Sequence, residues 1–119
     1  MKYVDGFVLP VSKKNLKAYF RLAAVASKVW KDHGAIQYCE CEGDDLQVQF
    51  GVPFPKQIKL KKGETVVFSF ITYKSRAHRD KVNAKVMADP RLACMMDTKK
   101  MPFDCKRMAW GGFKIAVKA

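Results

Sequence analysis

The feature that most constrains this chain is the stretch from Glu64 to Pro90, where a strand-like apolar run is followed at once by a basic, helix-like segment. Residues 65–73, TVVFSFITY, place apolar or small side chains on both faces of the expected strand. A strand that is apolar on both faces belongs in the interior of a sheet. Ser75 then predicts an N-cap for a helix from Arg76 to Ala88, which Asp89-Pro90 ends.

Two further elements precede this stretch. An aromatic and β-branched run predicts a first strand over Tyr3–Leu9, which Pro10 ends. Ser12 predicts the N-cap of a first helix, in which apolar residues recur at helical spacing as far as His33. Gly34 follows as the expected stop of that helix.

The remaining strands complete a familiar order. Residues 35–42 predict a second strand, and residues 106–117 predict a last strand with a bulge or bend at Gly111-Gly112. The order β-α-β-β-α-β is the ferredoxin-like motif, an α+β fold. It predicts one domain over residues 1–119, with a four-stranded antiparallel sheet and two helices on one face.

Three segments lie outside these elements. Residues 46–63 begin with a strand-like alternation, Leu46–Phe50, and continue through Gly and Pro into a Lys-rich run. A connection of this length in a compact domain is uncommon. An arm to a partner subunit, a lid and a passive surface excursion remain open. Residues 91–96 predict one short helical turn, and residues 97–104 predict a loop.

The charge of +12 is concentrated in the second half of the chain. Residues 1–55 hold seven Lys or Arg against six Asp or Glu, whereas residues 56–119 hold sixteen against five. The excess of positive charge in residues 56–119 favours acidic partners, but a Lys-rich surface also keeps a protein soluble. Only five of the 23 cations are Arg, the residue typical of phosphate and base recognition, which favours the role in solubility.

Two helices cover only one face of a sheet whose strands are apolar on both faces. The other face is therefore expected to meet a second sheet in a homodimer, or to stack RNA bases. The third strand lacks the basic residue and glycine of RNA-recognition strands, and Asp5 is expected on the aromatic face, where it would repel phosphate. A homodimer through the sheet faces is the prediction. An RNA-binding module that uses the basic surface is an alternative, although nucleic acid is not the favoured partner.

The four cysteines do not have the spacing of a metal site. Cys39 and Cys41 share one face of a strand, but Cys94 and Cys105 supply no matching pair, so reduced, buried thiols are predicted. The chain has two histidines and no acidic cluster beside them. No metal and no cofactor are predicted. The chain shows no secretory signal and no membrane-length apolar run, so a cytoplasmic protein without membrane contact is expected.

A ligand pocket is expected between the sheet and the helices. Small residues leave room there and charged residues can surround it, which makes five residues candidates: Gly6, Ser69, Arg76, His78 and Arg107. His78 lies in the first turn of its helix, where protonation is disfavoured, and serves as a base or as a cap. Asp104 is expected to form an ion pair with a nearby Arg. No catalytic residues are assigned, because no nucleophile-base pair, phosphate loop or dinucleotide fingerprint is present.

Three segments resemble one bacterial family. MKYVDGFVLPV, ETVVFSFITYKSRAHRDKVNAKVMADPRL and MPFDCKRMAWGGFKI are similar to the YbaA-like family of unknown function. The resemblance implies a dimeric α+β barrel of ferredoxin-like subunits. That superfamily includes cofactor-free monooxygenases, haem-binding enzymes, isomerases and small-ligand binders. The prediction is a homodimer with a small-ligand pocket, and a cofactor-free monooxygenase- or isomerase-like enzyme is an alternative.

Overall fold

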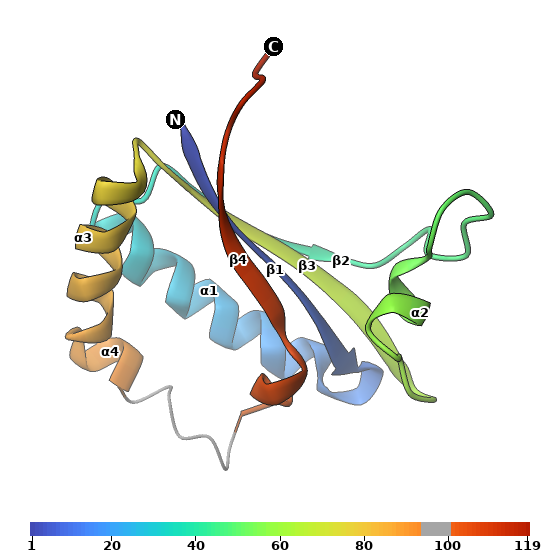
Figure 1. The fold of residues 1–119 in the computed structure, drawn as a ribbon. Coiled ribbons are helices and arrows are strands. Elements are labelled where there is room, and N and C mark those ends of the chain that lie inside the picture. The colour runs from blue at the N-terminus through green and yellow to red at the C-terminus, as the bar shows by residue number, and fades with distance from the viewer. Residues whose placement is uncertain (94–100) are drawn as a thin grey trace.

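The computed structural model describes residues 1–93 and 101–119, and it contains one antiparallel sheet with helices on one side (Figure 1). The sheet order is β2-β3-β1-β4, from β1 (Tyr3–Ser12), β2 (Gln37–Glu42), β3 (Glu64–Tyr73) and β4 (Ala109–Lys114). The main helices are α1 (Leu16–Asp32) and α3 (Arg76–Met87), with short helices α2 (Phe54–Gln57) and α4 (Pro90–Ala93). This arrangement confirms the predicted ferredoxin-like fold.

The two ten-residue strands form the centre of the sheet. β1 and β3 pair along their whole lengths, from Tyr3 opposite Tyr73 to Ser12 opposite Glu64. β2 pairs with the free edge of β3, and β4 pairs with the free edge of β1. The prediction of a central strand over residues 65–73 is therefore confirmed, and β1 is central as well.

The helix-covered side of the sheet, called the inner face, consists of alternate strand residues from Tyr3 to Val11 in β1 and from Val67 to Tyr73 in β3. These residues pack against the buried side chains of α1, which are Tyr19, Ala23, Ala26 and Val29. α3 adds Val82 and Val86 to the same core. The buried stripe of each helix has the spacing of three and four residues that an amphipathic helix requires.

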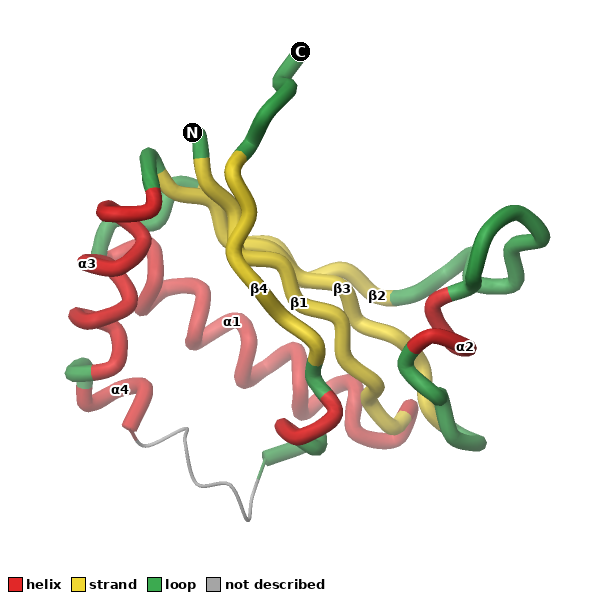
Figure 2. The backbone as a smooth tube through the Cα atoms, in the orientation of Figure 1, coloured by secondary structure: helices red, strands yellow, loops and turns green. Residues whose placement is uncertain are grey.

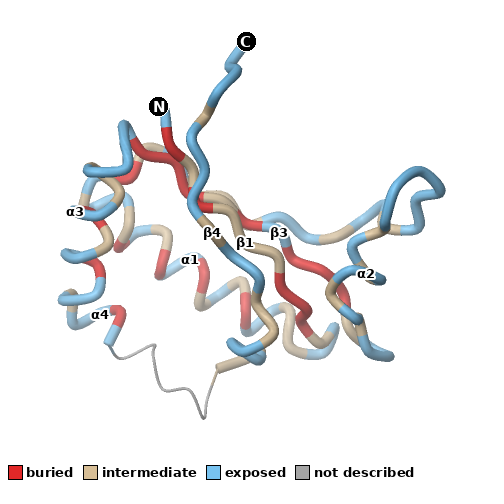
Figure 3. The backbone as a smooth tube through the Cα atoms, viewed as in Figure 1, coloured by how far each residue is buried: buried red, intermediate tan, exposed pale blue. Residues whose placement is uncertain are grey.

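The opposite side of the sheet, called the outer face, remains partly open (Figure 3). Its strand residues are Val4, Gly6, Val8, Pro10, Ser12, Glu64, Val66, Phe68, Phe70, Thr72, Gln37, Cys39, Cys41, Ala109, Gly111 and Phe113. Phe68 is 42% exposed and Phe113 is 60% exposed. Neither α1 nor α3 covers these two rings. In the single chain the outer face is therefore an apolar surface that is partly accessible to solvent.

Three strand predictions were wrong in detail. The last strand, predicted over residues 106–117, is shorter, because a 3₁₀ turn over Cys105–Arg107 precedes it and β4 ends at Lys114. β1 continues through Pro10 because Pro10 lies beyond the last pair between β1 and β4, Val8 with Ala109, where no partner needs its missing N–H. Gly111 and Gly112 form no bulge, since both stay in register with β1. A Cβ on Gly112 would lie 2.3 Å from the hydroxyl of Tyr3. Glycine is needed at Gly112 for this close approach.

The helix boundaries agree with prediction except at the first cap. The Ser75 hydroxyl accepts a hydrogen bond from the His78 N–H at 3.1 Å, as an N-cap should. Ser12 makes no such bond, because a 3₁₀ turn over Lys13–Asn15 precedes α1. Gly34 has the left-handed φ of 112° that stops α1. The predicted turn over 91–96 begins as α4, and its last three residues lie outside the described residues, as do residues 97–100 of the predicted loop.

Residues 46–63, called the arm, project from one end of the sheet (Figure 2). The alternation over 46–50 forms no strand, because the chain leaves the sheet after Glu42 and has no neighbour with which to pair. The arm contains α2 and exposes apolar side chains; Phe50 is 97% exposed and Val52 is 63% exposed. Among the described ranges, no helix is both long and apolar enough to pass through a bilayer.

Candidate functional site

A cavity of about 400 Å³ lies between the inner face of the sheet and the helices. Aromatic, aliphatic and methionine side chains form most of its wall, and a few polar groups interrupt them. Strands β1, β2, β3 and β4 supply the floor, and α1 and α3 supply the opposite side. The described lining residues are Asp5, Phe7, Leu9, Tyr19, Leu22, Ala23, Ala26, Trp30, Tyr38, Glu40, Ser69, Ile71, Asn83, Met87, Leu92, Met101, Phe103, Cys105, Met108 and Trp110.

The first polar group in this cavity is the carboxyl of Glu40, held between two tyrosines. Alternation along β2 brings Tyr38 and Glu40 to the same face, and α1 supplies Tyr19 opposite them. The Tyr19 hydroxyl donates to Oε1 at 2.7 Å, and the Tyr38 hydroxyl donates to Oε2 at 2.8 Å. Burial raises the pKa of Glu40, and the two hydrogen bonds oppose that rise without cancelling it. Burial also raises the pKa of both tyrosines, so they remain proton donors.

The second polar group is the carboxyl of Asp5, which is only 1% exposed. The Arg79 guanidinium approaches it, with Nη1 3.2 Å from Oδ1. The same guanidinium donates to the Tyr3 hydroxyl at 3.3 Å and lies 5.1 Å from the centre of the Tyr3 ring. Burial raises the pKa of Asp5, whereas the charge of Arg79 and a hydrogen bond from Asn83 lower it. Asp5 is therefore a buried acid with its own cation.

Asn83 connects the second group to the aromatic wall. Its Oδ1 accepts hydrogen bonds from Trp30 Nε1 at 3.1 Å and from the Tyr73 hydroxyl at 3.2 Å. These bonds fix the indole of Trp30 against the cavity, where it also packs on the Tyr38 ring at 5.7 Å. The polar groups of the cavity are thus held by packing on both sheet and helix, as a preformed site requires.

Of the five candidate residues, the structure places Ser69 in the cavity wall. Gly6 points to the outer face, where a Cβ would contact the Phe113 ring. The Nδ1 of His78 accepts a hydrogen bond from the Lys74 N–H at 3.0 Å, so the ring caps its helix. Arg76 is exposed at the start of the same helix, and neither residue lines the cavity.

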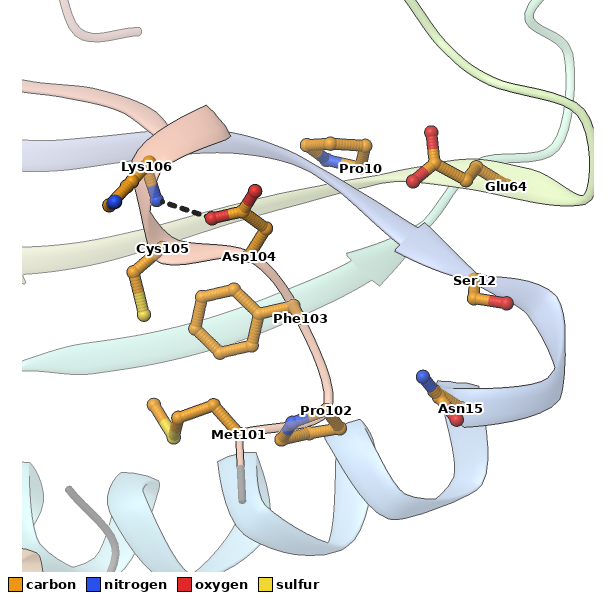
Figure 4. A pocket seen from close by; sticks show the side chains of 10 residues that line it. All are labelled: Pro10, Ser12, Asn15, Glu64, Met101, Pro102, Phe103, Asp104, Cys105 and Lys106. Carbon is orange, nitrogen blue, oxygen red and sulfur yellow. Dashed lines mark hydrogen bonds between the residues drawn. The ribbon is translucent and has the colours of Figure 1, made fainter. Parts of the chain in front are cut away.

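Arg107 lies away from the cavity and is held by Glu64, with distances of 2.6 Å from Nη1 to Oε2 and 2.9 Å from Nη2 to Oε1. The expected pair of Asp104 with an Arg is not what the structure shows, because Asp104 accepts the Lys106 N–H at 3.0 Å and caps a 3₁₀ turn. Figure 4 shows Asp104 in a second hollow of about 600 Å³, which Pro10, Ser12 and neighbouring loop residues line. Both acids that line this hollow already have partners, since Asp104 caps the 3₁₀ turn and Glu64 pairs with Arg107.

The thiols and histidines form no metal cluster within residues 1–93 and 101–119. The prediction of buried thiols was wrong for Cys41 and Cys105, which are exposed, and Cys39 is half-buried. Cys39 and Cys41 lie on the outer face, which the helices leave open. Cys94 lies outside the described residues. The His33 Nε2 is 2.8 Å from the Asp89 Oδ2, a contact that ties the end of α1 to the end of α3.

Sequence reasoning missed the two carboxyl groups that define the cavity. Asp5 was expected on the open aromatic face of the sheet, where it would repel phosphate. In the structure Asp5 lies on the helix-covered inner face, so its charge does not act on a partner at the outer face. Glu40 lies in a strand beside apolar and aromatic residues, and it shares the phase of Tyr38. A charged residue in the buried phase of a strand was the available signal for both.

Comparisons with known proteins agree with this fold. Residues 2–105 match the family described as a protein of unknown function, DUF1428. The uncharacterized protein YbaA of Escherichia coli strain K12 is 42% identical over 117 residues, which are 98% of this chain and 98% of YbaA. YbaA of Shigella flexneri has the same identity and coverage. The resemblance noted in the sequence is confirmed.

Solved structures show the same fold at low identity. A dimeric ferredoxin-like protein from an uncultured marine organism has a TM-score of 0.65 at 10% identity, and the match covers 100% of this chain and 98% of that protein. A nipsnap family protein with unknown function from Agrobacterium tumefaciens has a TM-score of 0.54 at 16% identity, with coverage of 95% and 86%. A second dimeric ferredoxin-like protein from an uncultured marine organism has a TM-score of 0.55 at 12% identity, with full coverage of both chains. At these identities the likeness concerns the fold alone.

Proposed function

This chain belongs to the DUF1428 family of unknown function, and from that premise we propose that it is a homodimeric protein that binds a small, largely apolar ligand. The observation that carries the proposal is the cavity of about 400 Å³ between sheet and helices. Cavities with apolar walls and a few fixed polar groups are the usual form of small-ligand sites. The carboxyl groups of Asp5 and Glu40 are the polar groups that would orient a ligand in this cavity.

The wall has the composition that such a ligand needs. Phe7 and Trp110 stack at 5.9 Å, and Met87 and Met108 offer flexible apolar surface around them. Ser69, the candidate retained from the sequence, adds a hydroxyl to this wall. Burial of a ligand's apolar surface would supply most of the affinity, at about 25 cal/mol for each Å² removed from water.

Tryptophan fluorescence tests the pocket directly, because both tryptophans of the chain, Trp30 and Trp110, line the cavity. Titration with a neutral apolar probe, 1-octanol, is expected to shift the emission to saturation. Ala23→Phe fills the wall without adding a tryptophan and should abolish the shift, while Ala24→Phe on the exposed side of α1 should leave probe affinity unchanged. Binding that survives Ala23→Phe would place the probe elsewhere and contradict the pocket.

The homodimer is proposed through the outer face. Its strand residues are mainly apolar and include no Lys or Arg. A face without cations suits an apposed sheet better than a phosphate backbone. Two proteins of similar fold are described as dimeric ferredoxin-like proteins, which supports a dimer for this chain. A second sheet would also cover Phe68, Phe113 and the thiols of Cys39 and Cys41.

Light scattering tests this interface. The wild-type chain of 13.5 kDa is expected to have about twice that mass in solution. Phe68→Lys places a charge on the outer face and should yield monomers, whereas Val25→Lys, at an exposed apolar position on α1, should not. A monomeric wild type would contradict the dimer but leave the pocket unaffected.

A second candidate function is an enzyme of the cofactor-free monooxygenase or isomerase kind. The observation that favours it is Glu40, a carboxyl with a raised pKa between two hydroxyl donors. Such a group can accept and return a proton beside a bound carbonyl compound. Deuterium exchange from solvent into a cyclic ketone, followed by NMR, tests it. Exchange that is equally fast with wild type and Glu40→Gln would contradict the enzyme.

A further inference from the structure

The charges of the cavity are opposite to those of the protein. The chain carries 23 Lys and Arg against 11 Asp and Glu, yet no Lys, Arg or His is among the described residues of the cavity wall. Among these described lining residues, Asp5 and Glu40 are the carboxylic acids. A ligand that enters this cavity therefore meets acidic side chains and no cation in the described part of the wall.

The two acids differ in whether their charge is matched. Asp5 has the Arg79 guanidinium 3.2 Å away, so its charge is compensated within the protein. Among the described residues, Glu40 has only the hydroxyls of Tyr19 and Tyr38, which are neutral. The charge of Arg79 lowers the pKa of Asp5, whereas the two tyrosine hydrogen bonds are what lower the pKa of Glu40 within the described chain. Glu40 is therefore the acid of the cavity that has no cation among residues 1–93 and 101–119.

The geometry around Glu40 leaves room for a further donor. Each oxygen of a carboxylate can accept two hydrogen bonds, and each oxygen of Glu40 receives one from a tyrosine. Ser69 lies directly opposite Glu40 in the pairing of β2 with β3 and faces the same cavity. The Ser69 hydroxyl makes no side-chain hydrogen bond to the described residues. The Ser69 hydroxyl is therefore a second hydrogen-bond acceptor beside the Glu40 carboxylate.

The apolar wall begins next to these acceptors. Across the sheet, Ser69 pairs with Phe7, and Phe7 pairs with Trp110. One row of the sheet therefore presents a carboxylate, a hydroxyl and two stacked aromatic rings in that order. This order matches a molecule with a charged head and an apolar body.

We infer, on the basis of the proposed ligand pocket, that its ligand is an amphipathic amine whose ammonium group pairs with the carboxylate of Glu40. The ammonium donates to Glu40 and to the Ser69 hydroxyl, and its apolar part lies along Phe7 and Trp110. Glu40 is half-buried, and partial desolvation of an unpaired carboxylate is unfavourable, so a ligand that supplies the cation is stabilised there. Anionic amphiphiles are excluded by the same charge.

Three probes of one chain length test this inference at pH 7.5 through the fluorescence of Trp30 and Trp110. They are n-octylamine, which is protonated at this pH, 1-octanol and octanoate. Octylamine is expected to bind wild-type protein at least tenfold more tightly than octanol, the size of effect of a charge-assisted hydrogen bond, and octanoate is expected to bind most weakly. Octanol affinity reports the pocket itself, and the ratio of amine to alcohol reports the charge preference.

Two variants of equal charge change complete the experiment. Glu40→Gln keeps the size and an acceptor but removes the charge, so the tenfold preference for octylamine should disappear while octanol still binds. Glu42→Gln, on the same strand but exposed and outside the cavity wall, should retain the preference. Equal binding of amine and alcohol to wild type, or a preference that survives Glu40→Gln, overturns the inference and leaves the pocket standing. Binding of none of the three probes overturns both.

Discussion

Replacement of Arg79 by Met should strongly destabilise the protein, because it leaves a buried carboxylate without its cation. Asp5 is 1% exposed, and Arg79 Nη1 is 3.2 Å from its Oδ1. Removal of one partner of a buried ion pair costs about 3–5 kcal/mol. Since the Arg79 side chain is 13% exposed and water can partly replace it, we expect the lower end, about 3 kcal/mol.

Urea denaturation measures this loss. With a slope of about 1.5 kcal/mol per molar urea, the midpoint should fall by about 2 M. Arg76→Met, at an exposed position one turn earlier on α3, is the matched control and should change the midpoint little. All samples are compared at one protein concentration, because the stability of a dimer depends on that concentration.

The pH dependence distinguishes a lost ion pair from lost packing. Burial raises the pKa of folded Asp5 above its ordinary value of 3.8, so ionisation of Asp5 opposes folding. The destabilisation that ionised Asp5 causes is absent below the pKa of Asp5 in the unfolded chain. It grows as the pH rises toward the pKa of Asp5 in the folded protein. Without Arg79 the folded pKa rises further. The deficit of Arg79→Met should therefore be largest at pH 7.5 and shrink toward pH 4.

Two results would refute this reasoning. A loss below about 1 kcal/mol would mean that Asp5 is adequately solvated or neutral in the folded chain. A large deficit that is the same at pH 7.5 and pH 4 would mean that Arg79 acts through packing on the Tyr3 ring. In the double variant, Asp5→Asn should recover part of the stability that Arg79→Met removes.

Three further predictions concern the frame of the site. Gly112→Ala should cost about 2 kcal/mol in thermal unfolding, because its Cβ would lie 2.3 Å from the Tyr3 hydroxyl. Ser75→Ala should cost about 1 kcal/mol in the same assay through loss of the N-cap of α3. The Arg107 side chain lowers the pKa of Glu64, so the stability that Glu64 adds is present above its unfolded pKa and lost as the pH falls. The stability advantage of wild type over Glu64→Gln should accordingly narrow from pH 6 to pH 3.

Each of these has an outcome that would contradict it. Gly111→Ala is the control for the first, since its Cβ would have no neighbour nearer than 3.9 Å, and an equal loss at Gly111 would remove the role of the Tyr3 contact. A melting temperature of Ser75→Ala equal to that of wild type would mean that water replaces the hydrogen bond between the Ser75 hydroxyl and the His78 N–H. If the difference in stability between wild type and Glu64→Gln is the same at pH 6 and pH 3, the ion pair of Glu64 with Arg107 adds no stability.

The fold was largely predictable because its signals are local and repeated. Alternation along residues 65–73, the cap at Ser75 and the stop at Gly34 each follow from backbone geometry and burial within a few residues. The order of the elements then selects one sheet topology among few. The same alternation predicted an apolar outer face, which the single chain leaves open.

The site was not predictable in the same way, because it depends on which distant residues meet. Glu40 is separated from Tyr19 by 21 positions, and Asp5 is separated from Arg79 by 74. The small size of Ser69 in a central strand predicted its place in the pocket, whereas Arg76 and Arg107 were predicted from their charge and His78 from its position in the first turn of a helix. Each of the three has a role or position set by its local turn or by a partner outside the cavity.

The sequence by itself determined the strands, the main helices and the apolar character of both faces of the sheet, since these depend on the period of apolar residues. The tertiary structure decided that, within the described residues, Asp5 has a cation while Glu40 has two hydroxyls, since the partners of a charged group are remote from it in the chain. That difference, which no local pattern contains, carries the inference about the ligand.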